Sequence, residues 1–199
     1  MNRLANSLIA ATALALASLS AQADGDAARG AKLAYTCLGC HGIENARNAY
    51  PKYSVPKLGG QNEAYIVAAL EEYETGARWH PTMRGFAAGL TDQDRADLAA
   101  YFNAEAPEIV SAEPVGTPPE KAAPCVACHG QNGVGTLDEY PTLTGQHADY
   151  IAQALNDYRL GKRQNPLMQP FAQQLSREDI LALAEFFSAQ KGLVTATVD

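Results

Sequence analysis

The sequence predicts an all-α protein of two tandem domains, and three observations lead to this prediction. Residues 56–102 align without a gap on residues 141–187, with 20 identical residues in 47 positions. Apolar residues of both copies recur at helical spacing, and no stretch alternates as a strand would. Between the copies, "APEIVSAEPVGTPPEKAAP" contains five prolines and has no helical period, which is typical of a linker. We therefore expect a first domain over 24–105, a linker over 106–119 and a second domain over 120–199.

Each copy predicts two main helices. The first has an apolar stripe at three- and four-residue spacing and is followed by Gly76 or Gly161, which we expect to end it. The last helix is expected to begin at a hydroxyl residue with an acid three positions later, Thr91 with Asp94 or Ser176 with Asp179. The stripes are Tyr65, Ile66, Ala69, Leu70 and Tyr73, then Tyr150, Ile151, Ala154, Leu155 and Tyr158; the last helices turn Leu98, Tyr101, Phe102, Leu183, Phe186 and Phe187 inward.

The two copies differ before the aligned region. The first copy begins with "DAARGAKLAYT", which predicts a leading helix, whereas "TPPEKAAP" in the second allows little more than a turn because of its prolines. The first copy also has three extra residues between His41 and Pro56. We expect this insertion to bulge, so that the two domains are not identical in their properties.

Residues 1–23 are typical of a secretory signal peptide. One cation, Arg3, precedes an Ala/Leu-rich run that ends at the cleavage pattern Ala21-Gln22-Ala23. An uncleaved anchor is the alternative. Removing Arg3 changes the formal charge from −7 to −8, which disfavours nucleic acid and anionic membrane surfaces as partners. The acidity suits a protein with a basic patch, or it serves only solubility.

All four cysteines lie in two copies of one motif, "CLGCHG" and "CVACHG". Disulfides would suit an exported protein, but they explain neither the repeated two-residue gap nor the adjoining histidine. A zinc site would need a fourth ligand and a geometry that this spacing does not supply. Covalent c-type haem accounts for every residue, because two thiols bind the two vinyl groups and the next imidazole binds iron. We expect two haem c groups, bound by Cys37 and Cys40 and by Cys125 and Cys128, with His41 and His129 as iron ligands.

Methionine is the expected ligand on the opposite face of each iron. Met83 and Met168 occur once per copy, at equivalent positions that follow Pro81 and Pro166. Core packing is the ordinary role of a lone methionine, but such a residue would not have to recur. The competing ligands, His80 and His147, align with Asn165 and Asn62 and so do not recur; we expect hydrogen bonding for His80 and solvation for His147.

Two arginines, Arg78 and Arg163, also match between the copies. A guanidinium pairs well with a carboxylate, so both are candidate partners of haem propionates, with a solvated helix-end cation as the alternative. Three aromatic residues, Tyr73, Tyr158 and Trp79, are expected to line the haem pockets rather than to relay electrons.

The sequence resembles the class I cytochromes c, and its doubling resembles the two-haem cytochrome c4 family of bacterial periplasms. The resemblance lies in the two cysteine motifs, in "PKLGGQ" and "PTLTGQ", and in "HPTMRGFAAGLTDQDRADLAAYF" and "NPLMQPFAQQLSREDILALAEFF". It implies two helical domains, each around one haem, related by a pseudo-twofold axis. It also implies that the carbonyls of Pro56 and Pro141 accept the outer N–H of His41 and His129.

An iron held by histidine and methionine has no free position for substrate, which favours electron transfer over catalysis. The resemblance implies a periplasmic, monomeric shuttle between a bc-type complex and a terminal oxidase, with peripheral membrane association left open. One alternative is the haem subunit of a flavoprotein such as a sulfide dehydrogenase. A two-haem peroxidase or thiosulfate-oxidising enzyme is less favoured, because it needs an iron that can open.

Overall fold

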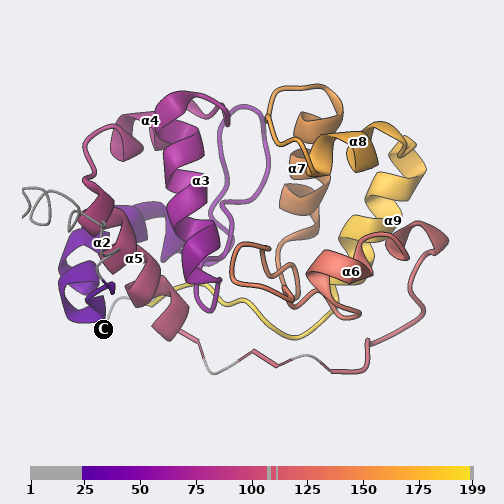
Figure 1. Ribbon diagram of the computed structural model, residues 1–199, viewed down its shortest axis with the longest axis horizontal. Helices are drawn as coiled ribbons and strands as arrows, with labels where there is room; N and C mark the ends of the chain where they lie inside the picture. Colours follow the sequence, from indigo (N-terminus) through magenta and orange to yellow (C-terminus); the bar gives the residue numbers. More distant parts are fainter. Residues whose placement is uncertain (1–23, 107–108, 111, 198–199) are drawn as a thin grey trace, which may run out of the picture.

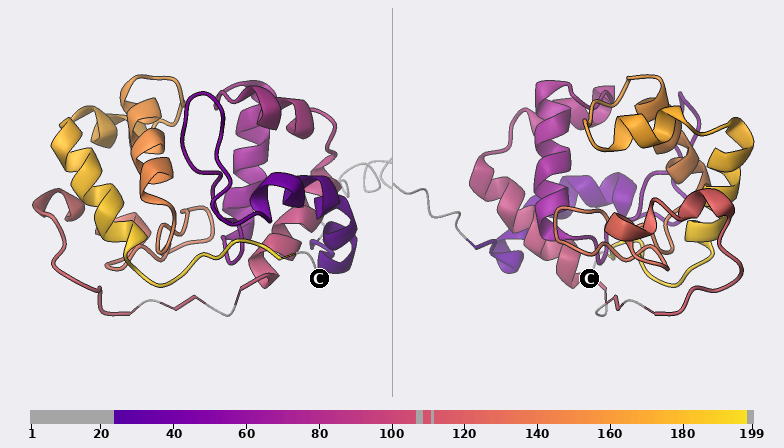
Figure 2. Two further views of the ribbon diagram at one scale, coloured as in Figure 1. Left: turned by 180° about the vertical axis from the view of Figure 1, so that it is seen from behind. Right: turned by 45° about the vertical axis from the view of Figure 1, so that its right-hand side comes forward.

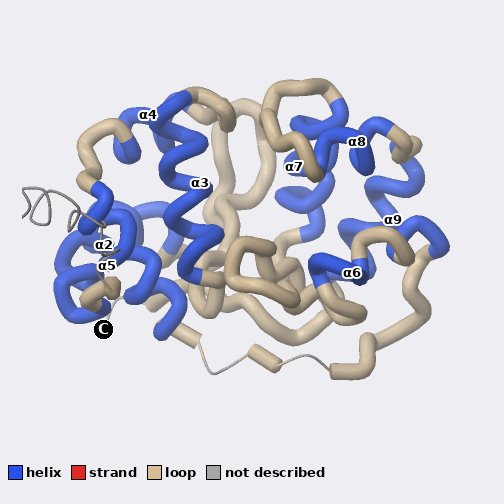
Figure 3. Tube along the Cα trace, in the orientation of Figure 1, coloured by secondary structure: helices blue, strands red, loops and turns tan. Residues whose placement is uncertain are grey.

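A computed structural model describes residues 24–106, 109–110 and 112–197, and the expected signal peptide lies outside them. Two groups of helices lie side by side, one on each side of Figure 1, and Figure 3 shows no strand in the described part of the chain. The all-α, two-domain prediction is confirmed. No helix among the described residues is long and apolar enough to cross a membrane.

The two groups of helices correspond to the two halves of the chain. The first group consists of α2 (Ala27–His41), α3 (Glu63–Thr75), α4 (Pro81–Ala87) and α5 (Asp92–Ala104). The second group consists of the 3₁₀ turn η1 (Glu120–Ala122), α6 (Val126–His129), α7 (Ala148–Arg159), α8 (Met168–Gln173) and α9 (Arg177–Ser188).

Helix α2 packs closely across α5. It begins after Asp26, whose carboxylate accepts the backbone N–H groups of Ala28 and Arg29. Where the helices cross, a Cβ added to Gly30 would lie 2.0 Å from the carbonyl oxygen of Asp97, so only glycine fits. The buried Asp97 carboxylate accepts from the Asp26 N–H at 2.7 Å and from the Arg29 guanidinium, which joins the two helices a second time.

The predicted helix ends have the expected local chemistry. Thr91 and Ser176 each form a full capping box, with the acid three residues later accepting the cap's backbone N–H. Helix α3 ends at Gly76 in the left-handed region (φ 83°), and Gly161, at φ 69°, follows the last residues of α7. Neither glycine can be replaced without backbone strain.

Each domain has its own small apolar core. The equivalent pairs Ile66 and Ile151, Leu98 and Leu183, and Phe102 and Phe187 are all buried. Tyr101, expected to face inward, is only half-buried, and its hydroxyl donates to the Thr197 carbonyl. The second domain has no counterpart of the long α2; a single 3₁₀ turn and the four-residue α6 replace it, as its prolines suggest.

The C-terminal segment, drawn in yellow, returns from α9 to the first domain through the lower half of Figure 1, and the left view of Figure 2 shows the same path. Gly59 and Val194 exchange two backbone hydrogen bonds, at 3.0 and 3.1 Å. Ala196, which is 1% exposed, belongs to the first domain's core. This crossing could not be predicted from the sequence, because the segment after α9 lies beyond the aligned repeat.

Candidate haem sites

The four cysteines lie where two thiols of each motif share one helical face. Cys37 and Cys40 are in the last turn of α2, while Cys125 precedes α6 and Cys128 lies within it. All four are free thiols. Burial raises the pKa of Cys37 and Cys125, so these groups are protonated near neutral pH. Two free thiols in each motif suit two thioether attachments.

The two histidines are buried and oriented by equivalent backbone contacts. The Nδ1 atom of His41 lies 2.8 Å from the Pro56 carbonyl oxygen, and that of His129 lies 3.0 Å from the Pro141 oxygen. Because a carbonyl only accepts, Nδ1 carries the proton and Nε2 keeps its lone pair. Burial lowers the pKa of both imidazoles, which favours the neutral form that binds iron.

The two methionines lie in the first turns of the short helices α4 and α8. Met83 is partly buried and packs against the first core. Its backbone N–H donates to Nδ1 of His80 at 3.3 Å, and the Met168 N–H donates to Oδ1 of Asn165 at 3.0 Å. His80 and Asn165, which align in the repeat, thus each accept the backbone N–H of the methionine three residues later.

Both ring nitrogens of His80 are engaged. Since Nδ1 accepts from Met83, Nε2 carries the proton and donates to Asn48 Oδ1 at 3.1 Å. The structure thus gives His80 the hydrogen-bonding contacts that the sequence predicts for it. His147 precedes α7, is half-exposed, and makes no side-chain capping bond.

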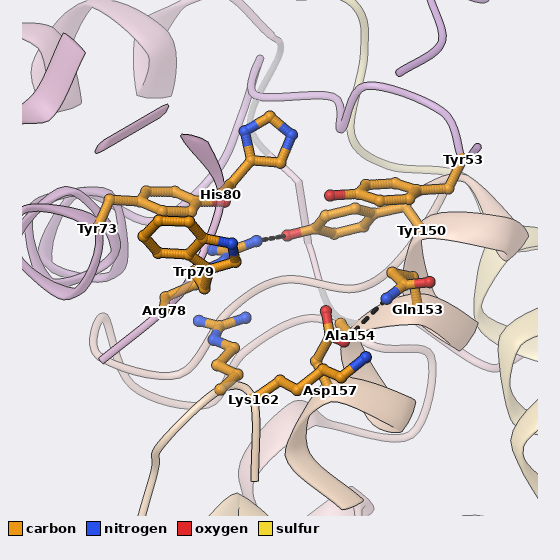
Figure 4. A pocket seen from close by; sticks show the side chains of 11 residues that line it. Tyr53, Tyr73, Arg78, Trp79, His80, Tyr150, Gln153, Ala154, Asp157 and Lys162 are labelled. Atoms are coloured by element: carbon orange, nitrogen blue, oxygen red, sulfur yellow. Dashed lines mark hydrogen bonds between the residues drawn. The ribbon is translucent and has the colours of Figure 1, made fainter. Parts of the chain in front are cut away.

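The matched arginines meet between the domains, where the backbones of Arg78 and Arg163 form an isolated antiparallel β-bridge. Each guanidinium stacks on a tyrosine of its own domain, Arg78 at 4.5 Å from the Tyr73 ring centroid and Arg163 at 4.7 Å from that of Tyr158. Each also donates to a tyrosine hydroxyl of the other domain, Arg78 to Tyr150 (Figure 4) and Arg163 to Tyr65.

The two arginines differ in their charged partners. Arg163 makes two hydrogen bonds to Glu72 Oε2, at 3.1 and 2.9 Å, whereas Arg78 forms no ion pair with any described carboxylate. Burial raises the pKa of Tyr65, but the nearby charges of Arg163 and Arg78 lower it by more, so that its pKa is about 8. A buried cation that only neutral groups contact suits an anionic neighbour such as a propionate.

The aromatic residues expected in the haem pockets do not all behave alike. Tyr73 and Tyr158 are buried, but the Trp79 side chain is 58% exposed, with the Arg84 guanidinium 5.6 Å from its ring centroid. The crossing contacts of Glu72, Tyr65 and Tyr150 were not expected from the sequence. The two tyrosines recur at equivalent positions, but helical spacing alone marks them only as inward-facing.

The inserted loop of the first domain also takes part in the interface. It folds back on itself, with the Val55 N–H donating to the Ala46 carbonyl at 2.8 Å. Its Arg47 guanidinium and Ser54 hydroxyl both donate to the carboxylate of Asp149 in the second domain, at 2.8 and 3.0 Å. The three extra residues therefore lengthen a loop that docks against the partner domain.

The fold and the donor sets together define two tandem c-type cytochrome domains. The cytochrome c family pattern matches residues 27–104 and 121–191. Cytochrome c4 of Pseudomonas aeruginosa is 37% identical, over 94% of this chain and 98% of its own. The crystal structure of reduced recombinant cytochrome c4 from Pseudomonas stutzeri aligns with a TM-score of 0.67 at 31% identity, covering 84% of this chain and all of that one.

The chain belongs to the cytochrome c4 family. It is accordingly an electron carrier rather than an enzyme, and it binds two haem c groups covalently through its two cysteine motifs. A further relative, the thiosulfate dehydrogenase electron acceptor of Stutzerimonas stutzeri, is 34% identical over 78% of this chain and 79% of its own.

Proposed function

We propose that this protein carries electrons in the periplasm between a quinol-oxidising bc-type complex and a terminal oxidase, with each iron held between a histidine and a methionine. The ligand pairs are His41 with Met83 and His129 with Met168. The observation that carries the proposal is the matched orientation of the two imidazoles, whose protonated Nδ1 atoms face the proline carbonyls and leave Nε2 for iron. Bound haem supplies the one-electron redox couple.

The residues around each haem suit its redox couple to electron transfer rather than to catalysis. Each imidazole is fixed in one tautomer by a backbone carbonyl, so it does not reorganise when the iron changes charge. The Met83 and Met168 thioethers would complete the ligand set of each iron, which would leave no place for substrate and would raise the reduction potential. Arg78 and Arg163 place two buried positive charges between the domains, where Arg78, and Arg163 beside its ion pair with Glu72, would bind haem propionates.

Docking to the partners would be transient. A monomer with a formal charge of −7 over the full chain suits partners that present a basic patch, because opposite charge accelerates encounter. Peripheral association with the membrane would bring the carrier to its bc-type donor.

Absorption spectra with haem quantification test the ligands. We expect two haems per chain and the weak long-wavelength ferric iron–sulfur band from both. Met83→Ala and Met168→Ala should each remove about half of that band, because one thioether is lost in each. His80→Asn is the matched control, since Asn165 accepts the equivalent methionine N–H in the second domain, and it should leave the band intact. One haem per chain, high-spin iron, or peroxide turnover by the unmodified protein would refute the assignment.

A second candidate role is electron acceptance from a dehydrogenase of sulfur compounds. The similarity to the thiosulfate dehydrogenase electron acceptor of Stutzerimonas stutzeri supports this role. A flavoprotein such as a sulfide dehydrogenase is another donor of this class. Rapid reduction of both haems by such an enzyme with its substrate, together with copurification, would favour this role. Reduction by a bc-type complex without any stable partner would favour the shuttle.

A further inference from the structure

Two glutamines at the domain interface have no part in the function described so far. Gln61 and Gln146 end the repeated stretches "PKLGGQ" and "PTLTGQ", five residues after Pro56 and Pro141. Both side chains are buried, at 3% and 4% exposure. A buried amide needs hydrogen-bond partners, and in both cases they come from the other domain.

Each glutamine holds one backbone residue of the opposite domain by two hydrogen bonds. Gln61 Oε1 accepts the Thr142 N–H at 2.8 Å, and its Nε2 donates to the Thr142 carbonyl at 2.9 Å. Gln146 makes the same pair of bonds to Lys57, both at 2.9 Å. Lys57 and Thr142 are equivalent in the repeat, so the arrangement obeys the pseudo-twofold symmetry.

The orientation of each amide is set by its surroundings. Gln61 Oε1 also accepts the N–H of Asn62 at 2.9 Å, and Gln146 Oε1 accepts that of His147 at 3.1 Å. An oxygen with two N–H donors cannot be exchanged for the NH₂ group without losing both bonds. Each Oε1 is therefore fixed against the N–H of the opposite domain.

These N–H groups belong to the peptides that orient the histidines. The Pro141 carbonyl and the Thr142 N–H are the two ends of one peptide group, as are the Pro56 carbonyl and the Lys57 N–H. A continuous chain thus runs from His129 through the Pro141–Thr142 peptide to Gln61. Its counterpart runs from His41 through the Pro56–Lys57 peptide to Gln146.

Hydrogen bonds in such a chain strengthen one another. An acceptor on the N–H end polarises the peptide and makes its carbonyl more basic. A more basic carbonyl draws the Nδ1 proton more strongly, which makes the imidazole a better electron donor and stabilises ferric iron. The result is a lower reduction potential for the haem in that domain.

We propose that each glutamine lowers the reduction potential of the haem in the opposite domain, Gln61 acting on the second haem and Gln146 on the first. Both are positioning residues, which act through a peptide and an imidazole. The potentials then depend on domain docking: separation of the domains raises both. This proposal rests on the histidine ligation proposed above and specifies how the interface regulates those sites.

The test replaces each glutamine by an apolar residue of similar length and measures each haem's potential separately. Spectroelectrochemistry gives the potentials, and hyperfine-shifted haem methyl resonances identify the haems. Gln61→Met should shift the second haem's equilibrium about two- to fivefold towards the ferrous state, ~18–41 mV at 59 mV per tenfold. The first haem should stay unchanged. Gln146→Met should reverse the pattern.

Asn62→Ala is the matched control. The Asn62 side chain also crosses the interface, donating to the carbonyls of Leu137 and Tyr140 at 3.3 and 2.7 Å and accepting from the Thr142 hydroxyl at 3.4 Å, but it makes no hydrogen bond to the Pro141–Thr142 peptide group. It should leave both potentials unchanged. If the glutamines only hold the two domains together, Asn62→Ala and Gln61→Met should change the reduction potentials of both haems in the same way. That result would overturn the proposal.

Two further measurements keep the outcome decisive. If Gln61→Met does not fold, Gln61→Asn retains a polar amide that is one methylene too short to reach Thr142, and the same crossed shift is expected. The Nδ1 proton resonance of His129 in the ferrous protein should move upfield as its bond weakens. An unmoved resonance and unchanged potentials, with normal haem spectra, would refute this inference alone; a spectrum without histidine ligation would instead refute the proposed function.

Discussion

The ion pair between Arg163 and Glu72 should stabilise the docked domains, and a double-mutant cycle can measure it. Its side chains are 5% and 20% exposed, and two hydrogen bonds join them. Breaking a buried pair by removing one partner costs about 3–5 kcal/mol, because the other charge stays buried. We therefore expect Arg163→Met to lower the free energy of unfolding by about 3 kcal/mol, and Glu72→Gln by a similar amount.

The cycle separates the pair from the packing that the same substitutions disturb. Each charge-assisted hydrogen bond contributes roughly 1.5–3 kcal/mol, and desolvation offsets part of this, so the coupling energy should be about 2 kcal/mol. Urea unfolding of the haem-loaded protein, followed by circular dichroism, gives the four free energies.

The repeat supplies a control cycle at the equivalent positions. Arg78 and Asp157 align with Arg163 and Glu72 but form no ion pair in the described residues. The cycle of Arg78→Met with Asp157→Asn should give a coupling below about 0.5 kcal/mol, which is the usual scatter for uncoupled sites. Equal couplings in the two cycles would refute the view that the interface is electrostatically asymmetric.

Three other changes test the fold. Gly30→Ala should separate α2 from α5 and lower the free energy of unfolding by at least about 2 kcal/mol, because its Cβ would lie 2.0 Å from the Asp97 carbonyl oxygen. Thermal unfolding measures this change. Gly39→Ala is the control and should not destabilise the protein, because its Cβ would meet nothing within 4 Å. Val194→Pro removes the N–H that pairs with Gly59 and should increase amide exchange in the first domain; unchanged exchange would contradict the role of the C-terminal segment. Hydrogen bonds from Thr91 and then Arg29 lower the pKa of Asp94 from 3.8 to about 2, so its contribution is complete above about pH 4 and is lost as pH falls towards 2; Asp94→Asn should flatten acid unfolding in that window.

The local structure of each half could be predicted from the sequence because short-range chemistry decides it. Apolar spacing gave the helices, and Thr91 and Ser176 gave the starts of the last helices, since a capping box involves only four consecutive residues. The cysteine motifs indicated haem because their chemistry depends on spacing within one turn. The orientation of His41 and His129 towards Pro56 and Pro141 came from resemblance to a family.

The interface could not be predicted, because it depends on which surfaces meet after both halves have folded. A period of 85 residues shows that Gln61 and Gln146 are equivalent, but it does not show that each binds the other domain's backbone. Nor does it show that Arg163 pairs with a carboxylate while Arg78 has no such partner among the described residues, although both are matched arginines. Repetition along a chain determines what each domain is made of, whereas docking decides which atoms of one domain reach the other.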